Sequence, residues 1–511
     1  MNQFVAAYAR FSQTWRGDLV AVSVGAAAPL AFSPLGWWPL AVLAVAAQLA
    51  LWLFSSPRRS AWRGLLFGLG FFSVGISWVF ISIHYYGYVG LVLSLFLTLA
   101  LILVMAAFPM LLGYCLARYF PQGFESQATR YKLLLIFPAA WLLMEWVRGW
   151  FMTGFPWLSL GYSQTDSPLA GLAPLLGVYG VSWAVVFSAA LVVGLVFDRA
   201  GRIFYLAMLI LLWLISAVFD SAEWTEPSGS PIKVALLQGN IPQDLKWHPD
   251  VKRPTIELYT ELSRDNWDSD LIVWPETALP TFYHEAEIFL YDFEQEAREN
   301  NTDLLIGMLS LDQDQRQYYN TMLSMGAERG QYHKNHLVPF TEYLPLKSVL
   351  GGLVAFMQVP MSDFSKGGSK QKPLKVANQY AGISICFEDA FGEEVIAALP
   401  QATFLVNVSN DAWFDDSWAP PQHLQMARMR ALETGRPMLR ATNTGITAII
   451  ESKGQIIKAA PQFEVTSITD TIQPRTGMTL YAITGNWLVV LSALFAISVA
   501  VWRLKKTARQ Q

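Results

Sequence analysis

Charge is scarce in this sequence, and the little there is lies unevenly. Asp, Glu, Lys and Arg make up 15% of the 511 residues, whereas soluble proteins average about 25%. Only six of the 39 acidic residues precede residue 221. The first 220 residues are therefore too apolar for a water-soluble domain, while the middle of the chain has the charge content of one. The net charge of −3 gives no sign of nucleic-acid binding.

Cysteine and histidine are also rare. Cys115 lies in a hydrophobic run and Cys386 lies far away in the polar part of the chain, so the sequence offers no favourable disulfide. No cysteine or histidine spacing is typical of zinc ligands. His333 and His336 would point to opposite faces of a strand, so a shared metal is not expected. The six histidines are assigned no role, and no metal or cofactor is predicted.

Long hydrophobic runs are abundant. A membrane-spanning helix needs roughly 20 apolar residues. Eight segments are candidates: 17–34, 36–55, 62–83, 88–117, 133–150, 172–197, 203–220 and 484–503. Lys and Arg gather in every second connection, which places both termini in the cytoplasm. The sequence thus predicts a membrane domain over 1–220, a periplasmic domain over 221–483, and a last span with a basic tail over 484–511.

The polar middle of the chain has the alternating pattern of an α/β domain. Short β-rich runs occupy 232–238, 271–274, 304–309, 319–325, 382–385, 404–408 and 447–450. Amphipathic stretches lie between some of them, near 251–266, 284–299, 391–399 and 421–434. Strands that alternate with helices predict sheets covered by helices. Together with the hydrophobic runs, the predicted fold class is a multi-pass helical membrane bundle plus an α/β sandwich.

Three residues in this middle domain could do chemistry. Cys386 follows an apolar strand and precedes an acidic, helix-forming segment, where a thiol can be exposed and activated; the alternative is a small buried residue at a strand end. Glu276 follows a buried strand and a proline, and suits a general base, or else a loop acid. Lys334 shares a strand face with apolar Val338, which favours an inward lysine that stabilises an anion over an edge lysine facing water.

Taken together, the sequence resembles the nitrilase, or carbon–nitrogen hydrolase, superfamily, and more closely its membrane-embedded branch, the apolipoprotein N-acyltransferases. The resemblance runs nearly end to end. The segments that carry it are 153–158, 161–164, 238–243 with Lys246-Trp247, 274–276, 334–340, 386–388, 409–414 and 425–431. It implies an αββα sandwich in which Cys386 is the nucleophile, Glu276 the base, and Lys334 the group that stabilises the oxyanion.

The resemblance also implies residues that support the site or bind substrate: Glu342, Glu388, Trp247, Phe387, Tyr343 and Asn410. Phe387 stands where the family commonly has tyrosine, which leaves a purely aromatic role at that position. Residues 344–361 are apolar and glycine-hinged, and predict a lid that dips into the bilayer, with a packed core loop as the alternative.

The implied reaction moves a fatty acyl chain from a phospholipid, with phosphatidylethanolamine as the expected donor. The chain passes through a Cys386 thioester to the α-amine of the S-diacylglyceryl cysteine of an apolipoprotein, which is the last step of lipoprotein maturation. No cofactor or nucleic acid is implied, and a monomer in the bacterial inner membrane is expected. A membrane-anchored nitrilase-type amidase remains an alternative, since the triad does not fix the acceptor. A transporter or receptor is disfavoured by the few intramembrane charges beyond Glu145 and Arg148.

Overall fold

The computed structural model of the chain describes residues 3–510 except 121–126, 313–315, 340 and 344–363. The chain divides into two compact units. The first comprises Met1–Phe80, Leu91–Ala222 and Thr484–Gln511, and the second comprises Ile81–Gly90 and Glu223–Ile483. The short segment Ile81–Gly90, which the sequence places between two hydrophobic runs, therefore groups with the polar part of the chain.

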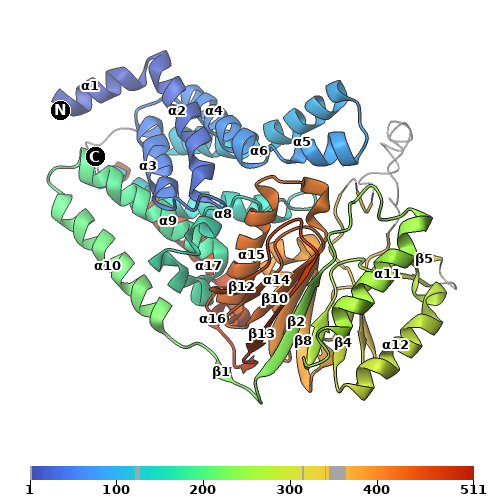
Figure 1. Ribbon diagram of the computed structural model, residues 1–511. Helices are drawn as coiled ribbons and strands as arrows, with labels where there is room; N and C mark the ends of the chain where they lie inside the picture. Colours follow the sequence, from blue (N-terminus) through green and yellow to red (C-terminus); the bar gives the residue numbers. More distant parts are fainter. Residues whose placement is uncertain (1–2, 121–126, 313–315, 340, 344–363, 511) are drawn as a thin grey trace. The chain divides into compact units, whose positions relative to one another are not determined.

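The first unit is helical. Its longer helices (Figure 1) are α1 (Gln3–Ser12), α2 (Trp15–Ala27), α3 (Pro39–Leu53), α4 (Pro57–Gly75), α6 (Leu91–Tyr119), α8 (Phe137–Trp150), α9 (Ala173–Phe197), α10 (Arg202–Ser221) and α17 (Trp487–Gln510). Among the described residues, five helices are long and apolar enough to cross a membrane, or six if the pair Pro57–Gly75 and Val79–Tyr86, bent by 62°, forms one span. The count of eight spans stays a prediction. The 13 residues of α2 extend only about 20 Å, which is shorter than a bilayer core of about 30 Å.

Small residues allow two helices of this unit to approach closely. A Cβ atom on Gly64 of α4 would lie 2.2 Å from the carbonyl oxygen of Pro109 on α6, and one on Gly68 would lie 2.6 Å from Cα of Ala106. No larger side chain fits at either position. Close backbone packing through glycine is the usual way in which helices associate inside lipid, where no hydrophobic effect drives them together.

The second unit contains two six-stranded sheets. One has the order β13-β2-β3-β4-β5-β6 and the other β12-β11-β10-β9-β8-β7. The first sheet consists of β2 (Ile232–Gln238), β3 (Leu271–Val273), β4 (Asp303–Asp312), β5 (Gln317–Met325), β6 (Gly330–His333) and β13 (Thr466–Ile472). The second consists of β7 (Leu374–Val376), β8 (Gln379–Ile385), β9 (Phe404–Ser409), β10 (Met438–Thr442), β11 (Ala448–Ile450) and β12 (Ile456–Ala459).

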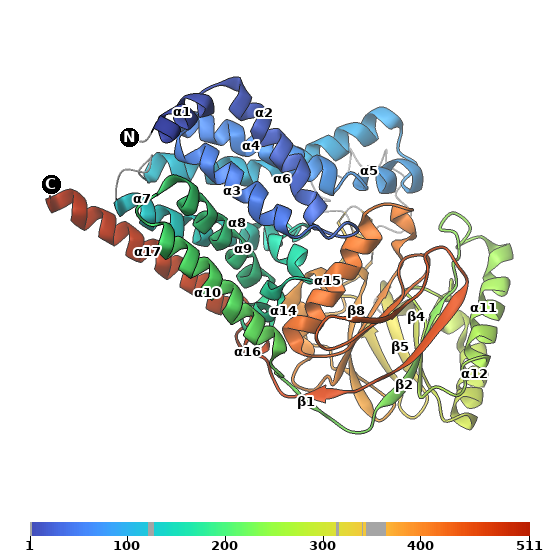
Figure 2. The same ribbon diagram turned by 60° about the vertical axis from the view of Figure 1, so that its left-hand side comes forward.

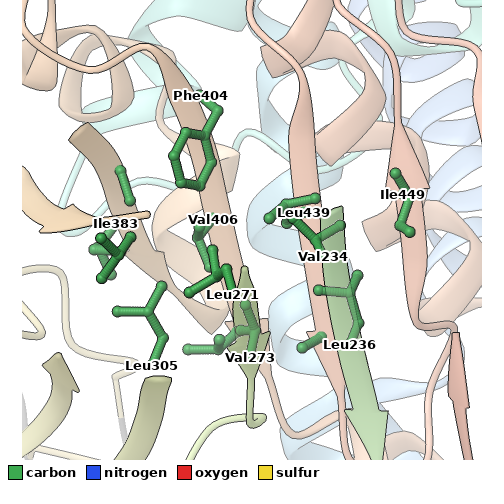
Figure 3. Packing of buried hydrophobic residues seen from close by; sticks show 14 of the residues in the cluster. Val234, Leu236, Leu271, Val273, Leu305, Ile383, Phe404, Val406, Leu439 and Ile449 are labelled. Carbon is green, nitrogen blue, oxygen red and sulfur yellow. The ribbon is translucent and has the colours of Figure 1, made fainter. Parts of the chain in front are cut away.

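The two sheets pack face to face through one apolar core. Val234, Leu271 and Leu305 of the first sheet meet Val406 and Leu439 of the second in a single buried cluster (Figure 3). A second cluster lies on the outer face of the first sheet, beneath α11 (Pro249–Arg264) and α12 (Glu287–Glu299). A third cluster joins the second sheet to α14 (Gly392–Val395) and α15 (Ala419–Thr434). Figure 2 shows these two helices beside that sheet. These layers confirm the predicted αββα sandwich.

Strand direction explains why candidate site residues gather at one edge. Strands β2, β3 and β4 are mutually parallel, as are β8, β9 and β10. The carboxyl ends of parallel strands meet at the same edge of a sheet, where ligands commonly bind. Cys386 comes directly after β8, Asn410 directly after β9, and Glu276 three residues after the end of β3. Lys334 comes directly after β6.

Candidate active site

Cys386 sits at a sharp turn from strand to helix. It follows β8 and begins the 3₁₀ helix η7 (Cys386–Ala390), and its φ of +54° lies in the left-handed region. A non-glycine residue there costs roughly 1–2 kcal/mol, so the surroundings must hold it. The side-chain amide of Asn407 does so by donating to the carbonyl oxygen of Cys386 at 3.2 Å. Such strained turns expose the side chain at their apex and are frequent at active sites.

The carboxylate of Glu276 is buried and held from two sides. The side-chain amide of Asn320, on β5, donates to Oε1 at 2.7 Å, and the backbone N–H of Asn410 donates to Oε2 at 2.8 Å. The turn that carries Glu276 lies against β4, where a Cβ atom on Gly307 would come within 2.2 Å of the carbonyl oxygen of Pro275. Only glycine at 307 lets the turn approach this closely.

Lys334 is the buried cation of the site, with 1% of its surface exposed. Its Nζ donates to Oε1 of Glu342 at 2.8 Å and to Oε1 of Glu276 at 3.4 Å. Burial alone would lower the pKa of Lys334, but the charges of Glu342 and Glu276 outweigh it and raise the pKa above its usual value. Lys334 therefore stays an ammonium ion under all ordinary conditions.

The resting thiol of Cys386 is neutral. Burial raises its pKa, the charge of Glu276 raises it further, and the opposing effect of Lys334 does not compensate. These same interactions show that the thiol lies within electrostatic reach of both Glu276 and Lys334. A thiol of this kind cannot attack as it stands, because the thiolate is the nucleophile. It requires a neighbouring base, and Glu276 is placed to act as one.

Glu388 joins the loop of Lys334 to the turn of Cys386. Its Oε1 accepts from the backbone N–H groups of Asn335 and His336 at 2.6 and 3.0 Å. Its Oε2 accepts from the backbone N–H of Ile385 at 2.7 Å and the hydroxyl of Tyr332 at 3.1 Å. Burial raises the pKa of Glu388 to about 7, although the backbone donors oppose the shift. Glu388 thus links both loops through four hydrogen bonds.

The other candidates take different places. Glu342 accepts from Lys334 and, through Oε2, from the backbone N–H of Val338 at 2.8 Å. The ring of Phe387 packs edge-on against Phe391, with 5.0 Å between centroids. The backbone of Tyr343 forms an isolated β-bridge with that of Pro339. Trp247 is 40% exposed. The predicted lid over 344–361 lies outside the described residues.

Three further residues contact this site, and none of them was assigned a role in it from the sequence. Asn320 donates to Glu276 from the middle of a strand. Lys246, which is 2% exposed, donates to Oγ1 of Thr277 at 2.7 Å and to the carbonyl of Glu276 at 3.3 Å. His423 reaches the carbonyl oxygen of Cys386 at 3.3 Å. No clear sequence signal marks Asn320, because the buried part of β5 also contains the polar residues Thr321 and Ser324.

An αββα sandwich with a half-buried cysteine and a buried glutamate and lysine at one edge defines the class of carbon–nitrogen hydrolases. The family model of that class, Carbon-nitrogen hydrolase, matches residues 233–479. A second model, Apolipoprotein N-acyltransferase N-terminal domain, matches residues 24–191. The chain is similar to the apolipoprotein N-acyltransferase of Methylococcus capsulatus, at 44% identity over 96% of this chain and 97% of the relative. The chain belongs to the apolipoprotein N-acyltransferase family.

Two further similarities complete the comparison. The apolipoprotein N-acyltransferase of Nitrosomonas europaea is 43% identical over 92% of this chain and 94% of that protein. The crystal structure of a carbon–nitrogen hydrolase from Helicobacter pylori covers 48% of this chain and 89% of its own, at 15% identity and a TM-score of 0.37.

Proposed function

We propose that this chain transfers a fatty acyl group from a membrane phospholipid to the N-terminal amine of a lipoprotein through a thioester on Cys386. Membership of the family makes the chain a membrane acyltransferase that acts on lipoproteins. The donor, the covalent intermediate and the roles of Glu276 and Lys334 are our proposal. We take phosphatidylethanolamine as the donor, and the S-diacylglyceryl cysteine of an apolipoprotein as the acceptor.

The first half-reaction loads the enzyme. Glu276 takes the proton of the Cys386 thiol as Sγ attacks the carbonyl carbon of the phospholipid ester. The negative charge moves to the carbonyl oxygen, where the Lys334 ammonium stabilises it. The ester C–O bond then breaks, and the departing alkoxide takes the proton back from Glu276. A lysophospholipid leaves, and a thioester remains on Cys386.

The second half-reaction unloads the enzyme by the same path. The α-amine of the acceptor attacks the thioester carbonyl, and Glu276 takes a proton from the nitrogen. The C–S bond breaks, the Cys386 thiolate recovers a proton from Glu276, and an amide forms. Aminolysis of a thioester is downhill, so the second step drives the cycle forward. The kinetics are therefore expected to be ping-pong.

The observation that carries this proposal is the convergence of Glu276 and Lys334 on a thiol that is neutral at rest. A neutral thiol needs a fixed base, and Glu276 is fixed by Asn320 and Asn410. A developing oxyanion needs a fixed cation, and Lys334 is buried and permanently charged. Both substrates carry acyl chains in lipid, so we place the reaction at the periplasmic leaflet of the inner membrane, with both termini in the cytoplasm.

Mass spectrometry of the intact protein tests the proposal. The purified chain is incubated with phosphatidylethanolamine and no acceptor, alongside Cys386→Ala and a control in which the exposed Cys115 becomes Ser. We expect a mass gain of one acyl group in the wild type and Cys115→Ser, removed by hydroxylamine and absent from Cys386→Ala. An unmodified wild type in the presence of intact lipid would exclude the first half-reaction. Steady release of free fatty acid without acceptor would favour the amidase-like alternative.

A further inference from the structure

A buried cluster of charged side chains lies directly behind the nucleophile turn. His423, on α15, is 2% exposed. Its Nε2 lies 2.9 Å from Oδ1 of Asp389 on η7, and its Nδ1 lies 3.1 Å from Oδ1 of Asp411 on η9 (Asp411–Phe414). Arg440 of β10 donates to the second oxygen of each aspartate, at 3.3 and 2.9 Å. None of these four residues takes part in the acyl-transfer steps described above.

The geometry fixes the protonation state of His423. A neutral imidazole carries a proton on only one nitrogen, and the bare nitrogen would face a carboxylate oxygen across a hydrogen-bonding distance. Both nitrogens of His423 face such an oxygen, so both must donate. The cluster then holds two aspartates, one arginine and one imidazolium, and its charges sum to zero. If His423 lost a proton, the cluster would carry one net negative charge in a buried site.

The same histidine contacts the peptide of the nucleophile. Nε2 of His423 lies 3.3 Å from the carbonyl oxygen of Cys386, which also accepts from Asn407. These two donors fix the plane of the peptide between Cys386 and Phe387. Because a trans peptide is planar, fixing its C=O also fixes its N–H, which points the opposite way. The left-handed conformation of Cys386 is thereby held from behind.

We propose that His423 is a positioning residue for acyl transfer: as an imidazolium between Asp389 and Asp411, it holds the Cys386 turn and keeps the charge behind the thiol at zero. The inference rests on the proposed function in taking Cys386 as the nucleophile. Asp411 already opposes thiolate formation by its charge. Loss of the imidazolium would leave that effect less well compensated.

The charged groups around His423 determine the pH at which its imidazolium loses a proton. Burial and Arg440 lower the pKa of His423, but Asp389 and Asp411 outweigh them and raise it to about 9. Below that pH the cluster is neutral. Above it the cluster gains a negative charge beside the thiol, and formation of the thiolate becomes harder. One pKa unit on the thiol corresponds to a tenfold change in the thiolate fraction.

Alkylation of Cys386 measures this effect without any lipid. The full-length chain carrying Cys115→Ser is treated with iodoacetamide from about pH 6 to about pH 11, a range that brackets the His423 titration. Three variants are compared with this chain. His423→Gln keeps one hydrogen-bond donor and His423→Leu keeps none, while His284→Gln changes an exposed histidine and serves as the control. The acyl-enzyme mass assay with phosphatidylethanolamine is run on the same samples.

We expect the logarithm of the alkylation rate of the Cys115→Ser chain, the parent, to rise with pH and to show a downward bend at about pH 9. His284→Gln should give the same profile. His423→Leu should be at least about tenfold slower near neutral pH and should approach the parent above the bend, with His423→Gln between them. A parent profile without a bend, or a deficit that is the same at every pH, would overturn the inference. Normal alkylation profiles with no acyl adduct in the parent would instead refute the proposed function alone.

Discussion

Replacement of Lys334 by methionine tests the charge balance on which the proposed reaction depends. The side chain keeps its approximate length but loses its charge, in a position that is 1% exposed. Glu276 and Glu342 then lie close together without Lys334 between them, and the amide of Asn320 lies 2.7 Å from the first carboxylate and 3.4 Å from the second. Two carboxylates in one buried place cannot both stay ionised, so one of them takes a proton.

Two separate losses follow, and their sizes differ. Removing an oxyanion donor typically slows acyl transfer about 100- to 1,000-fold. A proton shared between Glu276 and Glu342 keeps the base occupied for part of the time and costs about a further tenfold. We therefore expect Lys334→Met to form acyl-enzyme about 1,000- to 10,000-fold more slowly. Removing one partner of a buried ion pair should also destabilise the fold by about 3–5 kcal/mol.

The double variant Lys334→Met, Glu342→Gln separates these losses. With Glu342 neutral, Glu276 no longer shares a proton, so the base recovers while the oxyanion donor stays absent. Acyl-enzyme formation, followed by intact mass spectrometry over time, should therefore be about tenfold faster in the double variant than in Lys334→Met alone. A double variant as slow as the single one, or a single variant within tenfold of the wild type, would refute the charge-balance argument.

Three further predictions follow from other contacts. Glu388→Gln turns an amide N–H₂ toward at least one backbone N–H and should slow acyl-enzyme formation about tenfold, whereas Glu328→Gln, at an exposed ion pair, should not. Burial lowers the pKa of Lys246 to about 8, below the ordinary pKa that a lysine has in the unfolded chain. The free energy of unfolding should therefore increase as the pH rises between these two pKa values. Denaturant unfolding of Lys246→Met should lack this increase. Arg440→Met leaves the two buried aspartates Asp389 and Asp411 with the His423 imidazolium as their remaining cation in the cluster, and should lower the unfolding free energy by about 3–5 kcal/mol. The exposed Arg253→Met should change it very little.

The sandwich could be predicted because its strands are short, apolar and separated by amphipathic helices. The run 232–238 coincides with β2, and the runs at 271–274 and 404–408 differ from β3 and β9 by one residue. Strand β12 was not predicted, because all four of its residues are exposed and the strand therefore lacks an alternation of buried and exposed positions. The number of spans could not be fixed, because hydropathy does not register a bend such as the 62° break after Gly75.

Cys386, Glu276 and Lys334 could be found because each stands beside the end of a strand, and the structure brings all three together. Their roles stay predictions. Asn320, Lys246 and His423 were missed for a physical reason. Their partners lie 44, 31 and 34 residues away in sequence, and only the register of strands and the course of loops decides such pairs. The sequence alone does not predict which way a single polar side chain points.

The site is arranged so that the proposed reaction never changes its net charge. At rest, Lys334 is positive and Glu276 and Glu342 are negative, and the thiol is neutral. Moving the thiol proton to Glu276 leaves the total unchanged, whereas losing it to water would add a buried negative charge at high cost. The oxyanion, the thioester and the second attack preserve the same total. Water in place of the amine would preserve it too, so the charged residues cannot select the acceptor. What distinguishes a transferase from a hydrolase in this fold must therefore be which nucleophile reaches the thioester, and not the chemistry of Cys386, Glu276 and Lys334.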